Sequence, residues 1–130
     1  PTFVADLAGT YVFSLQVNDG KLDSNLSYVT YTAGAANVAP VANAGSAQTV
    51  VRGATVTLDG TGSTDANGDT LLYRWTLTFR PTGSTAALSL STLARPTFVA
   101  DVAGVYVATL VVNDGSLDST ITTVAVTATP

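Results

Sequence analysis

One stretch of this sequence occurs twice, and the repeat constrains the fold more than any other feature. Residues 1–33 align with residues 96–128 without a gap, so residue n corresponds to residue n + 95. About two-thirds of the aligned positions are identical. An internal repeat of this kind indicates a repeated structural unit. We therefore expect residues 1–33 to be the last third of one unit and the rest of the chain to hold a complete second unit.

Each copy of the repeat has the pattern of a β-hairpin. In the first copy, Tyr11, Phe13 and Leu15 alternate with polar or smaller residues and so share one face of a strand. An Asn-Asp-Gly turn follows at residues 18–20, which is a strong hairpin signal. The first copy thus predicts a hairpin with an apolar face. An isolated two-stranded hairpin is marginally stable in water at best.

Short apolar runs separated by Gly, Pro, Asn and Asp extend through the whole chain, and no stretch has a helical period. Many short strands with evenly spaced turns predict an all-β, antiparallel sandwich or barrel. Trp75 lies inside one of these runs, where a lone tryptophan is typical of the core of a sandwich. The expected strands are residues 1–5, 10–17, 26–32, 41–43, 48–51, 55–58, 71–79, 87–90, 97–100, 105–112 and 120–127.

The composition argues against several classes of function. Hydrophobic residues make up 46% of the chain and charged residues 11%, with a net charge of −4 and no basic cluster, so nucleic acid is not an expected partner. No apolar run is long enough for a membrane-spanning helix. The sequence contains no Cys, His or Glu, which removes the commonest nucleophiles, bases and transition-metal ligands. We therefore expect a protein that is not an enzyme.

Several motifs together resemble those of a PKD domain, although each motif alone is weak. The resemblance covers residues 37–128 as a whole repeat and residues 1–33 as its last third. One segment differs, because many PKD domains continue Asp-Phe-Gly-Asp-Gly after the Trp, whereas residues 76–84 here read TLTFRPTGS. The motifs are PVANAG at residues 40–45, VTLDGTGS at 56–63, DANGD at 65–69, YRW at 73–75, PTF at 96–98, AGVY at 103–106 and VNDG at 112–115.

The resemblance implies an Ig-like antiparallel β-sandwich of about seven strands, in a tandem or head-to-tail array. The expected domains are residues 1–33 as the C-terminal strands of a preceding repeat, residues 34–39 as a linker, and residues 40–130 as a complete domain. It also implies a secreted or cell-surface protein in which the domain is a spacer, stalk or adhesive module. The low content of charged residues is typical of such a location.

One loop has the composition of a calcium site. Asp65, Asn67 and Asp69 place three oxygen-bearing side chains at alternate positions, and Gly68 permits a turn between them. The bidentate Glu of an EF-hand loop is missing, and the alternative is a turn in which these side chains bind their own backbone. Similarity to calcium-binding PKD domains implies Asn37 as a further ligand. Ca²⁺ is the only cofactor that we expect.

The first hairpin needs a neighbour to cover Tyr11, Phe13, Leu15 and Val17, since an exposed apolar face and a free strand edge favour aggregation. An upstream unit of a longer chain could supply the missing strands. Alternatively, the hairpin could fill a groove in another copy of this chain, which would build a fibre by strand complementation. A long covalent array of units is the arrangement we favour. In each case the expected partners are neighbouring copies of the same repeat.

A second hypothesis is an accessory module that binds surface glycans or the insoluble substrate of a secreted polysaccharide hydrolase. Modules of this kind usually present a row of exposed aromatic side chains. We expect Trp75 in the core, which leaves Phe79, Tyr28 and Tyr31 as candidates for such a surface.

Overall fold

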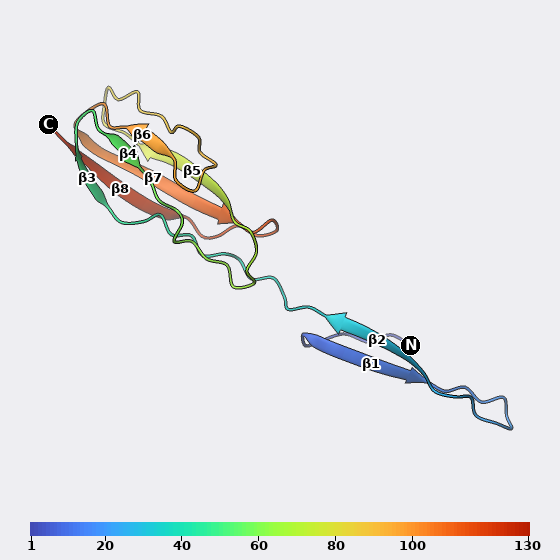
Figure 1. The fold of residues 1–130 in the computed structure, drawn as a ribbon. Coiled ribbons are helices and arrows are strands. Elements are labelled where there is room, and N and C mark those ends of the chain that lie inside the picture. The colour runs from blue at the N-terminus through green and yellow to red at the C-terminus, as the bar shows by residue number, and fades with distance from the viewer. The chain divides into compact units, whose positions relative to one another are not determined.

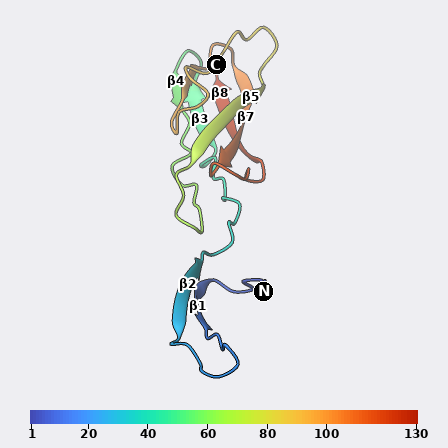
Figure 2. The same cartoon turned by 90° about the vertical axis from the view of Figure 1, so that its right-hand side faces the viewer.

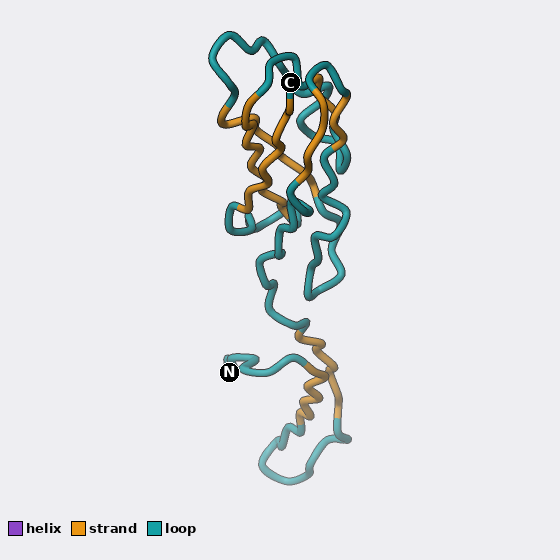
Figure 3. Tube along the Cα trace, turned by 90° about the vertical axis from the view of Figure 1, so that its left-hand side faces the viewer, coloured by secondary structure: helices purple, strands orange, loops and turns teal.

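The computed structural model describes all 130 residues and contains strands, turns and loops but no helix (Figure 3). No helix is therefore available to cross a membrane. The chain divides into two compact units, unit 1 (Pro1–Asn37) and unit 2 (Val38–Pro130), and this boundary falls inside the predicted linker. The strands are β1 (Gly9–Leu15), β2 (Ser27–Ala33), β3 (Gln48–Val51), β4 (Thr55–Thr57), β5 (Leu72–Phe79), β6 (Thr97–Val99), β7 (Gly104–Asn113) and β8 (Thr122–Thr129).

Unit 2 is built from two sheets (Figures 1 and 2). One sheet has four strands in the order β3-β8-β7-β5, and the other pairs β4 with β6. All pairs are antiparallel except β3 and β8, which run parallel, with Gln48 opposite Val126. The predicted all-β sandwich is confirmed. The sandwich is antiparallel apart from this one edge pair, and β3 can run parallel to β8 because a long connection, not a hairpin turn, joins the two strands.

The core of unit 2 lies between its two sheets. Trp75 from β5 is 2% exposed, and Tyr106 and Leu110 from β7 are fully buried. From the other sheet, Val56 and Phe98 enter the same cluster. Side chains on one face of a strand recur with a period of two, which is why alternate residues of β7 and β8 are buried. The predicted position of Trp75 in the core is confirmed.

Unit 1 is a two-stranded hairpin, and its pairing is the same as that of β7 and β8. Gly9 lies opposite Ala33 and Leu15 opposite Ser27, and the residues 95 positions later, Gly104 with Ala128 and Leu110 with Thr122, pair in the same way. The two copies of the repeat therefore fold locally into the same hairpin. Unit 1 contains no second sheet.

Three of the predicted strands are not formed. Residues 1–5 are irregular, although residues 97–99, the counterparts of residues 2–4, form β6. β6 exists because it pairs with β4, and unit 1 has no strand equivalent to β4. Of residues 41–43 only Val41 is paired, in a single bridge to Thr64, and residues 87–90 form no strand.

Candidate functional site

The inner face of the unit 1 hairpin is an apolar surface without a covering sheet. We define it by the residues equivalent to buried positions of unit 2, which are Phe3, Tyr11, Phe13, Leu15, Val17, Val29 and Tyr31. Leu15 is 62% exposed and Val17 58%, whereas their counterparts Leu110 and Val112 are fully buried. The four residues predicted to contact a neighbouring unit thus belong to one continuous face.

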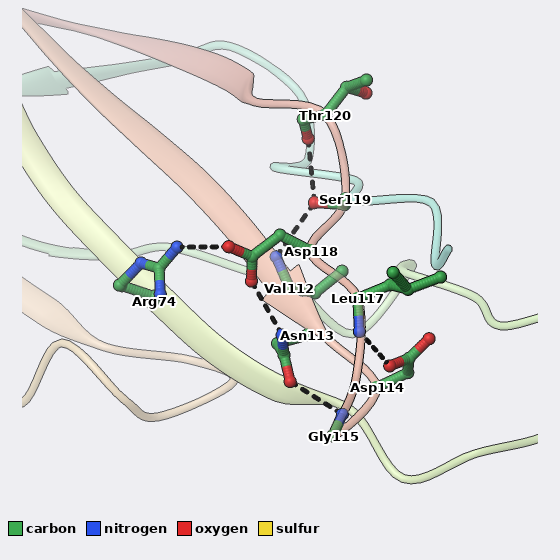
Figure 4. A network of polar contacts seen from close by, with 9 residues as sticks. All are labelled: Arg74, Val112, Asn113, Asp114, Gly115, Leu117, Asp118, Ser119 and Thr120. Carbon is green, nitrogen blue, oxygen red and sulfur yellow. Dashed lines mark hydrogen bonds and ion pairs between the residues drawn. The ribbon is translucent and has the colours of Figure 1, made fainter. Parts of the chain in front are cut away.

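The tip of each hairpin is held by a polar network that is nearly the same in the two copies, and Figure 4 shows the network of unit 2. In unit 2, the side-chain amide of Asn113 donates to Asp118 at 2.9 Å, and the Asn113 side-chain oxygen accepts from Gly115 N–H at 2.7 Å. The Ser119 hydroxyl accepts from Val112 N–H at 3.0 Å. In unit 1 the same three bonds measure 2.7, 2.6 and 3.0 Å. The tip is therefore determined by local sequence.

The two tips differ at one carboxylate. Asp118 forms an ion pair with Arg74 of β5 at 3.1 Å (Figure 4), and the pKa of Asp118 is lowered, mainly by the hydrogen bond from Asn113 and next by Arg74. Its counterpart in unit 1, Asp23, keeps the hydrogen bond from Asn18 but forms no ion pair. Unit 1 lacks the strand that would carry the arginine.

The base of each hairpin carries a tyrosine corner. In unit 2 the Tyr106 hydroxyl donates to the carbonyl oxygen of Val102 at 2.7 Å and lies 3.0 Å from Asp101. Asp101 also accepts hydrogen bonds from the Ser84 hydroxyl and from the Thr85 N–H and hydroxyl. These donors, with Ser84 the largest contributor, hold the pKa of Asp101 far below the ordinary aspartate range.

The tyrosine corner of unit 1 is present but incomplete. The Tyr11 hydroxyl donates to the carbonyl oxygen of Leu7 at 2.8 Å and lies 3.2 Å from Asp6. Asp6 has no further hydrogen-bond donor equivalent to Ser84 or Thr85. As at the tip, the bonds within the hairpin are formed, and the bonds to the rest of a sandwich are missing.

Aromatic side chains gather on the inner face of unit 1. The ring of Phe3 lies 4.5 Å from that of Phe13, 5.4 Å from Tyr11 and 5.7 Å from Tyr31, measured between centroids. An open hollow of about 600 Å³ adjoins this cluster, with Phe3, Phe13, Leu15 and Val29 in its wall. Its lining is mainly apolar, so the face is suited to covering by another apolar surface.

The predicted cation loop lies in unit 2. One carboxylate oxygen of Asp65, Oδ1, accepts from the N–H groups of Asn67 and Asp69, which is the turn given above as the alternative. The Asn67 side-chain oxygen accepts from Val38 N–H at 2.8 Å. The second carboxylate oxygen of Asp65, Oδ2, is buried and has no hydrogen-bond partner. A buried carboxylate oxygen without a donor fits a hard cation, because ligation would satisfy it.

The other predicted ligands, Asp69 and Asn37, give weaker support for a cation site than Asp65 does. The structure contains no group of three acidic side chains that could together hold a metal. Asp69, at the end of the loop, is exposed. Asn37 is the last residue of unit 1 and stays a predicted ligand. The feature that sequence analysis missed is the orphaned Asp65 Oδ2, because burial of a single atom has no sequence signal.

The three candidate aromatic residues for a glycan surface do not form a row. Tyr28 and Tyr31 are both exposed but are separated by three positions in β2, so they lie on opposite faces of the hairpin. Tyr31 corresponds to Val126, which is buried in the complete unit. Phe79 is exposed at the end of β5.

Comparisons with known proteins agree with this fold. The family of K319L-like PKD domains matches residues 44–128. The PKD domain from KIAA 1837 protein, solved in solution, is 28% identical with a TM-score of 0.57, and the alignment covers 73% of this chain and 91% of that one. No curated protein sequence matches the chain.

A nucleoside hydrolase-related hypothetical protein from Saccharophagus degradans, associated with carbohydrate metabolism, has the same fold over part of its length. It is 24% identical with a TM-score of 0.61, and the alignment covers 72% of this chain and 26% of that one. The chain thus spans about a quarter of that protein.

Proposed function

Because the chain belongs to the family of K319L-like PKD domains, we propose that it is a non-catalytic structural repeat of an extracellular or cell-surface fibre or stalk. PKD domains are generally non-catalytic modules. The observation that carries the proposal is the unit 1 hairpin of β1 and β2, which repeats the pairing of β7 and β8 but lacks the sheet that would bury it. Strands of a neighbouring unit in a longer array would cover the apolar face of this hairpin.

The mass and location of the native polypeptide test this function. Whole cells are treated with a protease that cannot enter them, and the protein is followed with an antibody on a denaturing gel. We expect a band much larger than the 13.2 kDa of this sequence, which the protease removes. A band near 13.2 kDa would support strand exchange between separate chains instead. A band that the protease leaves intact would refute the surface location.

The alternative function is a carbohydrate-binding accessory module of a secreted polysaccharide hydrolase. The exposed rings of Phe79 and Tyr28 favour it, although they lie in different units and form no row. Retention of the chain on chitin or cellulose, abolished in Phe79→Ala, would support this alternative over the structural repeat. The Arg52→Ala variant, which changes an exposed charged residue, is the matched control.

We also propose that Asp65, Asn67 and Asp69 hold a Ca²⁺ ion in unit 2. The orphaned Asp65 Oδ2 supports this assignment. Millimolar Ca²⁺ should raise the melting temperature, EDTA should reverse the rise, and Asp65→Asn should abolish it, while Asp23→Asn should not. The absence of any shift at millimolar Ca²⁺ would refute the site.

A further inference from the structure

We propose that the inner face of the unit 1 hairpin is covered by a segment that precedes Pro1 in the same polypeptide, and that this segment has the fold of residues 38–95 but not their side-chain sizes. The inference deepens the proposed function, on which it rests in taking the hairpin as part of a repeat. It identifies the partner of the hairpin and distinguishes it from a second copy of this chain.

The fold of the missing segment follows from the hairpin that has its partner. β7 and β8 have the same pairing as β1 and β2, and residues 38–95 cover their inner face. In unit 2 that face also receives β6, whereas the equivalent Phe3 lies in an irregular segment and is 46% exposed, against 3% for Phe98. A strand equivalent to β4 would give residues 2–4 a partner and draw Phe3 into a core.

Two acidic side chains of unit 1, Asp6 and Asp23, indicate which polar groups the missing segment carries. Asp118 is paired with Arg74, and Asp101 is bound by Ser84 and Thr85, all of which lie within residues 38–95. Their counterparts Asp23 and Asp6 have kept only their partners within the hairpin. The segment that covers unit 1 should therefore carry a cation at the hairpin tip and hydroxyl groups at its base.

The side-chain sizes show that the segment differs from residues 38–95. Phe13 stands where unit 2 has Ala108, and Tyr31 stands where unit 2 has Val126. Ala108 and Val126 are each 1% exposed and belong to the core cluster of unit 2. Protein cores are close-packed, and inserting larger side chains forces neighbouring groups out of their rotamers. The partner of unit 1 must therefore leave more room opposite these two positions.

The same argument weighs against a second copy as the partner. In another copy of this chain, residues 38–95 already cover their own β7 and β8. The unit 1 hairpin could replace that hairpin only by bringing Phe13 and Tyr31 into a core shaped for Ala108 and Val126. The competing hairpin is also covalently attached, which gives it a high effective concentration. The two hairpins of this chain are therefore not interchangeable.

The test extends the full chain with a second copy of residues 38–95 joined before Pro1, and measures hydrogen exchange of the amides in β1 and β2. With the native hairpin, we expect their protection to stay far below that of β7 and β8. With Phe13→Ala and Tyr31→Val together, protection should rise by about tenfold or more, toward that of β7 and β8. The same double variant without the extension is the control and should show no rise.

Three results would overturn the inference. Equal protection of the native and the double-variant hairpin by the extension would show that an identical segment fits. Absence of protection in both would show that the fold of residues 38–95 is the wrong partner. If the unextended 130-residue chain formed dimers and Phe13→Asp converted them to monomers, a second copy would be identified as the partner.

Introducing the larger side chains of unit 1 into unit 2 tests whether the core of unit 2 has room for them. Ala108→Phe with Val126→Tyr should lower its melting temperature by at least about 4 °C, since overpacking destabilises a domain of this size to that extent. An unchanged melting temperature would mean that the core of unit 2 accepts both hairpins. None of these results depends on where the protein is located, so this inference and the proposed function can fail separately.

Discussion

The repeat provides a matched pair of leucines for testing how much the covering sheet contributes. Leu110 and Leu15 occupy equivalent places in hairpins of the same pairing, but Leu110 is fully buried and Leu15 is 62% exposed. Leu110→Ala replaces a buried isobutyl group with a methyl group and leaves a cavity, which destabilises a protein by about 3 kcal/mol. Leu15→Ala changes a side chain that is largely in water, where the effect is within about 0.5 kcal/mol.

Differential scanning calorimetry of the 130-residue chain separates these values. For a unit of this size, 1 kcal/mol shifts the melting temperature by about 4–8 °C. We therefore expect Leu110→Ala to lower the main transition by about 12–24 °C and Leu15→Ala to lower it by less than about 4 °C. Urea unfolding at 25 °C gives the same comparison if thermal unfolding is irreversible. Shifts of equal size would refute the reasoning, because they would show that the face around Leu15 is also buried.

Three further outcomes follow from unit 2. Tyr106→Phe should destabilise it by about 1–2 kcal/mol in urea unfolding, since the buried hydroxyl links Asp101 to the backbone, and an unchanged midpoint would mean that water replaces it. The pKa of Asp101 is depressed in the folded state, so its contribution to stability is present above the ordinary aspartate pKa and is lost as the pH falls toward the folded value. Ser84→Ala should therefore be less stable than the native chain at pH 7, with the difference shrinking only once the pH falls well below the ordinary aspartate pKa; a difference that grows in acid would contradict this sign. Arg74→Ala should change the urea midpoint only slightly, because Arg74 and Asp118 are both largely exposed, and 1 M salt should remove what difference there is.

Much of the architecture could be predicted from the order of the residues. Period-two alternation located β1, β5, β7 and β8 to within one or two residues, and the Asn-Asp-Gly turns located both hairpin tips. These features depend on contacts between residues close in the chain, so local sequence contains the information. The turn at residues 65–69 could be predicted for the same reason, since Asp65 accepts hydrogen bonds from residues two and four positions away.

Features that depend on distant contacts could not be predicted. The parallel pairing of β3 with β8 joins residues 78 positions apart, and the ion pair of Arg74 with Asp118 joins residues 44 apart. Neither has a local pattern. Residues 1–5 have the sequence of β6, yet they form no strand, because a strand requires hydrogen-bond partners from another strand.

The repeated stretch shows where the sequence alone was decisive and where it was not. Residues 1–33 and 96–128 determine by themselves the pairing of their two strands, the turn at the tip and the tyrosine corner at the base, and these are the same in both copies. The tertiary structure alone decided that Leu110 is buried and Leu15 is exposed. The physical reason is that a side chain is buried only when a second surface packs against it, and in this chain only the second copy has a covering sheet.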